Sequence, residues 1–267
     1  MPKESIFWKH KKAVKLYHKK VSKQSSGVID EKHIKEFITT LKKGVKVVSL
    51  GIGSGRELSW LKKLKNIKEI IGIDYSDDFL NICREVAAEC KIKATLIKDN
   101  LFYLRKLKKV VKNEKLPLIY VCLINTLGNF EEKERKKVLK NVKNLMRKKD
   151  RLILSLYKRP NEIKTRMFLP PQIRLRGGLE RKIKLGTLIE YSYIEFLWVT
   201  IFEKYHCFPR LWYNEKNNDV TIYAGKEKVI ISHRFSKEEI KELAQKTKLK
   251  IEKFIEGKFM WVVVLKI

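Results

Sequence analysis

Short apolar runs alternate with amphipathic segments between residues 30 and 157. The runs have the length of buried strands, and five follow in order: the run that begins at Val45, the run that Asp74 closes, and residues 94–97, 118–124 and 151–157. Apolar residues recur at helical spacing before and between these runs, at residues 30–41, 57–65, 77–91, 101–111 and 131–148. Such alternation of strand and helix predicts an α/β fold built on a parallel sheet.

This alternation stops after residue 157. Residues 158–232 contain paired prolines and glycines, a strand-like run at 187–194, and a second run at 220–223 that follows the hairpin signal Asn217-Asn218-Asp219. The helical pattern resumes at Phe235, where Ser236 and Glu239 form a capping box. Two final strands, residues 251–255 and 259–265, are joined through Gly257. We therefore expect a β-rich insertion between the fifth strand and the last helix.

The loop after the first strand carries the most specific motif of the chain. Gly51, Gly53 and Gly55 stand at alternate positions between a strand and a helix. Such a loop lets backbone amides approach a ligand and points a helix N-terminus at it. Asp74, at the end of the next strand and about 20 residues further on, is placed to accept hydrogen bonds from a ribose. The pattern predicts a nucleoside-binding site.

The spacing of the glycines narrows the choice of nucleoside. A dinucleotide fingerprint has Gly or Ala three positions after its second glycine, where this chain has Arg56. A Walker loop is excluded because no Gly-Lys-Ser/Thr follows. The GxGxG loop, with acids at the ends of the following strands, resembles the motifs of the class I S-adenosylmethionine-dependent methyltransferases. Ser49 departs from that pattern, since the family usually has an acid there that holds the methionine amino group through water.

The resemblance implies a fold, a cofactor and a domain organisation. The fold is α/β: a seven-stranded, mostly parallel, Rossmann-like methyltransferase sheet flanked by helices, with the last strand antiparallel. Residues 1–267 then form a single methyltransferase domain. Its parts are N-terminal helices at 1–44, a cofactor-binding core at 45–157, the insertion or acceptor cap at 158–232, and the final helix and hairpin at 233–267. The implied cofactor is S-adenosyl-L-methionine, the methyl donor.

The resemblance also implies which residues bind the cofactor and the acceptor. The implied cofactor-binding set is Gly51, Gly53, Gly55, Asp74, Tyr75, Asp99, Asn100 and Asn125. Within it, Asp99 matches the acid that faces the adenine amino group. Asn125 is the catalytic candidate, as an acceptor-orienting residue, because its segment is similar to the NSL or NTL segment after the fourth strand in glycine, sarcosine and histidine N-methyltransferases. The alternative is that Asn125 only caps its loop, before a helix that Asn129 and Glu132 cap.

The acceptor pocket is expected where the insertion overhangs the donor, between the insertion, a helix at residues 5–23 and the loop at Asn125. The alternative for the 5–23 helix is packing on the flank of the sheet. Aromatic residues of the insertion either line the pocket or form a satellite core: Tyr191, Tyr193, Trp198, Phe202, Tyr205, Phe208, Trp212 and Tyr213. His206, which lies among them, is either a base or a structural residue.

A formal net charge of +31 is ordinarily typical of a protein that binds nucleic acid. Lysine, however, greatly outnumbers arginine, which recognises phosphates and bases with its planar fork, and the lysines are spread along nearly every predicted helix. Four arginines of the insertion would favour RNA if they face the pocket: Arg166, Arg174, Arg176 and Arg181. We expect a small-molecule acceptor methylated at nitrogen, with RNA (tRNA) or protein methylation and a non-catalytic cofactor-binding module as alternatives.

Cysteine spacing and the length of the apolar runs exclude other classes. The four cysteines, Cys83, Cys90, Cys122 and Cys207, lack CxxC spacing and clustered histidines, so we expect buried, reduced thiols and no metal site. No apolar run has the length of a membrane span, and the N-terminus lacks the apolar segment of a signal peptide. A cytoplasmic protein without a membrane partner is therefore expected, and the sequence indicates nothing about its oligomeric state.

Overall fold

The computed structural model describes residues 31–41, 44–159, 209–214, 216–257 and 259–267, together with residues 14, 15, 17, 18, 201 and 205–207. The predicted strand at 187–194, the arginines from Arg166 to Arg181 and most of the predicted 5–23 helix lie outside these residues. Of that helix, Val14, Lys15 and Tyr17 are helical, and the Tyr17 ring packs edge-on against Phe79 with ring centroids 5.7 Å apart.

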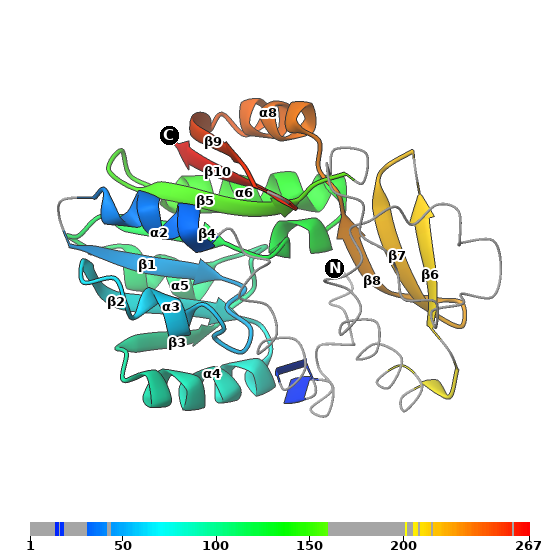
Figure 1. The fold of residues 1–267 in the computed structure, drawn as a ribbon, viewed down its shortest axis with the longest axis horizontal. Coiled ribbons are helices and arrows are strands. Elements are labelled where there is room, and N and C mark those ends of the chain that lie inside the picture. Colours follow the sequence, from blue (N-terminus) through cyan, green and yellow to red (C-terminus); the bar gives the residue numbers. More distant parts are fainter. Residues whose placement is uncertain are drawn as a thin grey trace.

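A seven-stranded sheet in the order β3-β2-β1-β4-β5-β10-β9 forms the centre of the molecule (Figure 1). Its strands are β1 (Val45–Leu50), β2 (Ile67–Asp74), β3 (Ala94–Lys98), β4 (Leu118–Cys122), β5 (Arg151–Tyr157), β9 (Lys250–Glu256) and β10 (Met260–Lys266). The first five pair in parallel, and β10 runs antiparallel to both β5 and β9. This arrangement confirms the predicted mostly parallel sheet with an antiparallel last strand.

Helices cover both faces of this sheet, which is why its central strands are continuous apolar runs. One face packs against α2 (Glu31–Thr39), α3 (Leu58–Leu61) and α4 (Asp77–Cys90). The other packs against α5 (Arg105–Val111), α6 (Glu132–Leu145) and α8 (Lys237–Lys246). In β4 all five side chains are buried, because the strand lies at the centre of the sheet between the two helical layers.

Three helix starts differ from the sequence prediction. The helix after the glycine loop is only the four-residue α3, and α5 begins at Arg105 because residues before it form a turn that ends in Leu104 at φ 48°. The helix α6 is capped by Glu131 and Glu134 in a capping box, so the predicted cap by Asn129 and Glu132 is wrong. The cap lies two residues later than predicted, because Glu131 and not Asn129 is the extended residue that directly precedes the helix.

The described end of the insertion is a separate antiparallel sheet in the order β6-β7-β8 (Figure 1). Its strands are β6 (Pro209–Asn214), β7 (Asp219–Ala224) and β8 (Glu227–His233). The β6–β7 hairpin confirms the predicted turn, whereas β8 was not predicted as a strand. Phe235, fully buried, follows β8 and accepts a hydrogen bond from Trp261 Nε1 on β10 at 3.0 Å. The small sheet is thereby anchored beyond the ends toward which β1, β4 and β5 point.

Candidate functional site

The glycine loop joins β1 to α3 and has a left-handed backbone at each glycine. The φ angles of Gly51, Gly53 and Gly55 are 75°, 55° and 76°. A Cβ atom on Gly51 would lie 2.8 Å from the Thr126 side chain, and one on Gly55 would lie 2.7 Å from Cys83 Sγ. A Cβ atom on Gly53 would meet no atom of the described residues within 4 Å. Gly51 and Gly55 are therefore required for packing, while Gly53 borders open space that a ligand can enter.

Asp74 lies at the end of β2 and is hydrogen-bonded to this loop. Its Oδ2 accepts from the Gly53 N–H at 3.0 Å, and its Oδ1 accepts from the Ser76 N–H at 3.0 Å. Burial raises the pKa of the Asp74 carboxyl to about 6, although these backbone donors act in the opposite direction. The structure thus brings Asp74 and the middle of the glycine loop together, as the motif predicts. Tyr75 follows Asp74 as a half-buried residue before the Ser76 cap of α4.

A second buried acid lies next to the loop and was not singled out in the sequence. Glu57 precedes α3 and is 5% exposed, and its Oε1 accepts a hydrogen bond from the Ser49 hydroxyl on β1. Burial is the main cause that raises the pKa of Glu57. The signal that could have found it is an acid just after the glycine loop in a chain that lacks the usual acid at position 49.

Asp99 and Asn100 follow β3, and their side chains hold the turn that leads into α5. The Asp99 Oδ2 accepts from the N–H groups of Lys106 and Leu107 at 2.8 and 2.9 Å, which caps the helix. The Asn100 Oδ1 accepts from the Phe102 N–H at 2.8 Å. Asp99 also lies next to Asp74, since its own N–H donates to the Asp74 carbonyl at 3.0 Å. Contact of Asp99 or Asn100 with adenine stays a prediction.

Asn125 is buried, and both ends of its side-chain amide are used within the protein. Its Nδ2 donates to Ser232 Oγ at 3.2 Å and to the His233 carbonyl at 3.0 Å. Its Oδ1 accepts from the Tyr157 N–H at 3.0 Å, and the residue is 1% exposed. Of the two roles predicted for Asn125, this geometry favours the structural one, because the side chain ties the loop after β4 to β5 and β8. An acceptor-orienting role stays a prediction.

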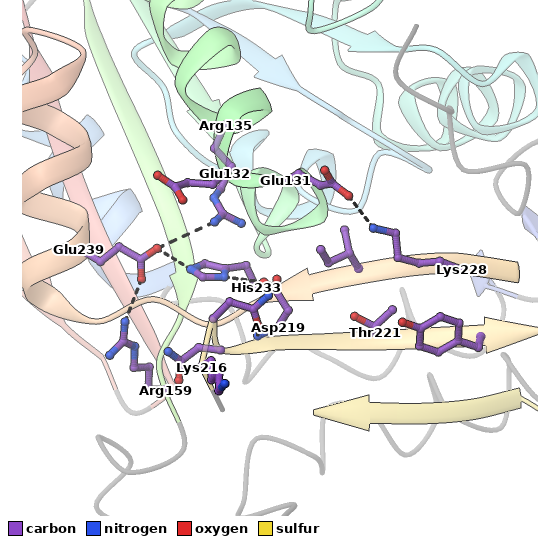
Figure 2. A pocket seen from close by; sticks show the side chains of 14 residues that line it. Glu131, Glu132, Arg135, Arg159, Lys216, Asp219, Thr221, Lys228, His233 and Glu239 are labelled. Carbon is purple, nitrogen blue, oxygen red and sulfur yellow. Dashed lines mark hydrogen bonds and ion pairs between the residues drawn. The ribbon is translucent and has the colours of Figure 1, made fainter. Parts of the chain in front are cut away.

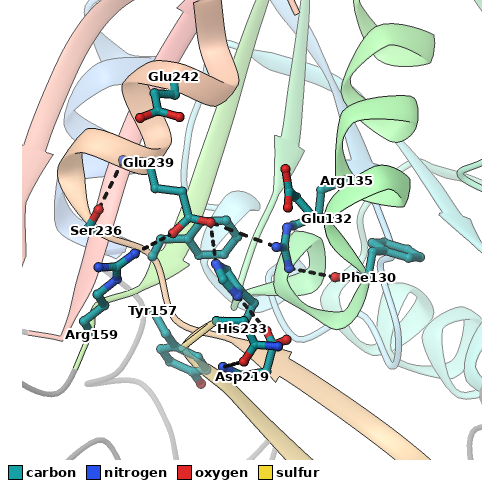
Figure 3. A network of polar contacts seen from close by, with 12 residues as sticks. Phe130, Glu132, Arg135, Tyr157, Arg159, Asp219, His233, Ser236, Glu239 and Glu242 are labelled. Atoms are coloured by element: carbon teal, nitrogen blue, oxygen red, sulfur yellow. Dashed lines mark hydrogen bonds and ion pairs between the residues drawn. The ribbon is translucent and has the colours of Figure 1, made fainter. Parts of the chain in front are cut away.

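A network of charged side chains surrounds His233, the last residue of β8 (Figure 3). The His233 ring contacts Asp219 Oδ1 through Nδ1 and Glu239 Oε1 through Nε2, each at 2.6 Å. Glu239 also pairs with Arg159 at 3.2 Å and with Arg135 at 4.0 Å. Glu239 was predicted to complete a capping box with Ser236, but its side chain binds His233 and Arg159 instead, while Ser236 alone caps α8.

The network borders a polar cleft of about 600 Å³ between α6, α8, β7 and β8 (Figure 2). Its charged lining is balanced. The acids are Glu131, Glu132, Asp219 and Glu239, and the bases are Arg135, Arg159, Lys216, Lys228 and His233. Because these residues come from four elements, no local motif in the sequence predicted the cleft. His206, the histidine that the sequence singled out, is exposed and does not line it.

Several predicted features lie elsewhere or outside the described residues. Of the aromatic residues predicted to line a pocket, Tyr205 is half-buried, and the side chains of the other seven lie outside the described part of the chain. Cys83 and Cys122 are buried, whereas Cys90 and Cys207 are half-buried and all four are free. Over the described ranges, no cluster of three or more His, Cys, Asp or Glu side chains is arranged to hold a metal ion. No described helix is both long and apolar enough to span a membrane.

The chain was compared with protein families, with curated proteins and with solved structures. Residues 47–149 match a family described as a methyltransferase domain. No curated protein matches the chain. The strands β2, β3 and β4, the helices α3 to α6, the glycine loop and Asp74 lie within the matched residues.

Solved structures resemble the chain over nearly its whole length at low sequence identity. PH0226 protein from Pyrococcus horikoshii OT3 is 15% identical with a TM-score of 0.61, over 96% of this chain and 99% of that one. An S-adenosylmethionine-dependent methyltransferase from Clostridium acetobutylicum ATCC 824 is 12% identical with a TM-score of 0.55, over 96% and 98%. The CcbJ methyltransferase from Streptomyces caelestis is 12% identical with a TM-score of 0.58, over 89% and 94%. These likenesses confirm the Rossmann-like methyltransferase fold.

Proposed function

We propose that this chain, a class I S-adenosylmethionine-dependent methyltransferase, transfers the methyl group to a nitrogen atom of a small polar molecule. The family match of residues 47–149 and the fold support the enzyme class and the cofactor. The acceptor is the proposal, and the observation that carries it is the small, charge-balanced cleft beside the loop of Asn125.

The residues around the glycine loop fit the cofactor. Gly53 borders open space, and Asp74 presents a carboxyl group at the same point, held by the Gly53 N–H. The hydroxyl of Ser54, between the two glycines, is buried and finds no hydrogen-bond partner within the described ranges. A ligand with ribose hydroxyls and a polar tail would satisfy such groups. We therefore propose that Asp74 binds the ribose and that the backbone of the glycine loop lies against the cofactor at Gly53.

Methyl transfer depends mainly on how the protein positions the acceptor relative to the methyl donor. When bound, S-adenosylmethionine supplies an electrophilic methyl group on a positively charged sulfonium. The protein must align the acceptor in line with that methyl group and exclude competing water. An amine acceptor must also lose its proton before it attacks. Asn125 serves this arrangement by fixing the loop after β4 against β5 and β8, so that β8 keeps one position beside that loop.

The cleft favours a small polar acceptor over RNA. Its volume of about 600 Å³ lies in the range of ligand sites for small molecules. Four acids stand among its lining residues, and they would repel a phosphate backbone, whereas sites for RNA carry an excess of positive charge. Glu132 has the most exposed side chain of these four acids, at 65%, and we propose that it binds the amine in place of its ion pair with Lys136 on the same helix.

The net charge of +31 favours RNA as the second candidate, and one experiment separates the two. The protein is incubated with S-adenosylmethionine that carries a deuterated methyl group, once with pooled small amines and once with bulk tRNA. We expect the mass shift in a small amine, with turnover that changes little between low and moderate salt. Label that enters only tRNA, with activity that falls steeply as salt rises, would replace the proposal with the RNA function.

A matched pair of variants then tests the cleft. Glu132→Gln should raise the KM for the amine about two- to fivefold, the size expected for an exposed charge contact. Donor affinity should not change, because Glu132 lies on α6, away from the glycine loop. Glu85→Gln, an exposed acid on α4, is the control and should behave as wild type. Equal KM values in all three proteins would show that the acceptor binds outside this cleft.

A further inference from the structure

We infer that Glu57 recognises the ammonium group in the methionine part of bound S-adenosylmethionine, with Ser49 as its positioning residue. The inference rests on the proposed function, since it concerns the same donor site. It assigns a role to a residue that follows the glycine loop rather than to the strand end, where the resemblance places an acid. Three observations carry it: the Ser49–Glu57 contact, the burial of both side chains, and the second acid at Asp74.

The first observation is geometric. Ser49 is a buried polar residue of β1, two positions before Gly51, and its hydroxyl donates to Glu57 Oε1. A hydroxyl at position 49 carries no charge, but it binds a carboxyl group. A carboxyl group therefore contacts β1 at position 49, although the residue that carries it is the one before α3.

The second observation is energetic. Glu57 is 5% exposed, and Ser49 is 2% exposed. Burial is the main cause that raises the pKa of Glu57, the hydrogen bond from the Ser49 hydroxyl and the charge of Arg56 act against it, and the carboxylate of Asp74 adds a smaller upward effect. A buried carboxylate is costly unless a cation or several hydrogen-bond donors offset its lost hydration. A cationic ligand would therefore bind favourably here, and it would lower the cost of ionising Glu57.

The third observation separates the tasks of the two acids. Asp74 accepts hydrogen bonds from the backbone amides of Gly53 and Ser76, which hold its carboxyl group at the middle of the glycine loop. Glu57 is bound from the β1 side by Ser49. The donor carries hydroxyl groups on its ribose and an ammonium group on its methionine part. Two separate carboxyl groups at one loop match these two features, the first with Asp74 and the second with Glu57.

Calorimetry with two ligands tests the assignment on the intact chain without any acceptor. S-adenosylhomocysteine carries the ammonium group, and 5′-methylthioadenosine has the same nucleoside without the amino-acid part. Glu57→Gln should weaken S-adenosylhomocysteine roughly ten- to a hundredfold, as expected for a lost hydrogen bond to a charged group. It should leave the affinity for 5′-methylthioadenosine unchanged. The double variant Ser49→Asp with Glu57→Gln returns the carboxylate to the strand end and should restore most of the loss.

These measurements distinguish a wrong role for Glu57 from a wrong methyltransferase function. A loss of equal size for both ligands, with a lower Tm, would assign Glu57 a structural role and overturn the inference. Unchanged affinity for S-adenosylhomocysteine would overturn it as well, while donor binding by the wild type keeps the methyltransferase function intact. If wild type bound neither ligand, the donor site itself would be wrong. Should Glu57→Gln fail to fold, Ser49→Ala provides the second measurement, with a smaller loss that is again confined to S-adenosylhomocysteine.

Discussion

Replacing Asp74 by Asn should stabilise the ligand-free protein at neutral pH and weaken donor binding at the same time. The reason is the environment of the carboxyl group, which is 8% exposed and lies against the glycine loop. Burial raises its pKa from 3.8 to about 6. An acid whose pKa is raised by folding binds its proton more tightly in the native state, so the stability of the native state falls as pH rises between these two values.

The size of the effect follows from the shift. A change from 3.8 to about 6 corresponds to about 3 kcal/mol at most, since one pKa unit is worth about 1.4 kcal/mol. Below pH 3.8 the protonated acid resembles the amide of Asn, and the two proteins should be similar in stability. Above pH 6 wild type carries the cost of the buried charge, whereas the Asn variant does not. Its advantage is reduced by the hydrogen bond from Gly53 or Ser76 that the Asn NH₂ group cannot accept.

Donor binding should change in the opposite direction. A carboxylate that accepts from ribose hydroxyls contributes about 1.5–3 kcal/mol, so the Asn variant should bind S-adenosylhomocysteine roughly ten- to a hundredfold more weakly. In wild type the affinity should rise about tenfold between pH 5 and pH 7, because the acid with a pKa of about 6 becomes ionised over that interval. The Asp74→Asn variant should lose the part of this rise that comes from Asp74, while any part that comes from Glu57, whose pKa is also raised by burial, should remain.

Thermal unfolding at pH 4 and pH 8, paired with calorimetry of S-adenosylhomocysteine over the same interval, measures both effects. Glu85→Gln on the exposed surface of α4 is the control for the removal of one negative charge. The reasoning would be refuted if Asp74→Asn were less stable relative to wild type at pH 8 than at pH 4. It would equally be refuted if the variant bound the ligand with wild-type affinity.

Two further substitutions separate ligand contact from packing. Gly53→Val should abolish donor binding, because its side chain would occupy the open space beside the loop and the residue has a left-handed backbone; calorimetry that shows unchanged affinity would mean that the loop faces elsewhere. Asn125→Ala removes three hydrogen bonds that join the loop after β4 to β5 and β8, so it should lower stability by about 1–3 kcal/mol and reduce donor affinity and turnover together. Turnover that falls ten- to a hundredfold with unchanged Tm and donor affinity would instead support the acceptor-orienting role of Asn125.

Local patterns in the sequence predicted most of the strands and helices and the glycine loop. Strand and helix periods are properties of neighbouring residues, so the strands from β1 to β5 and the helix α4 could be located from the chain alone. In a parallel sheet the carboxyl ends of all strands meet at one edge, which is why Gly53 and Asp74, 21 residues apart, could be predicted to lie together. The strand β8 was missed because its state depends on pairing with β7 rather than on a clear alternation of its own.

Tertiary structure alone decided what the side chains of the site do. Asp99 caps α5 and Asn125 binds residues 107 and 108 positions away, and such contacts depend on the directions in which folded elements meet. The contact of Glu57 with Ser49 and the pairing of His233 with Asp219 and Glu239 arise in the same way, since each joins residues from different elements. Burial, which raises the pKa of Asp74 and Glu57, is a property of the packed molecule. The sequence therefore determined where the glycine loop and Asp74 meet, and the packing of distant segments determined the charge and the hydrogen bonds around them.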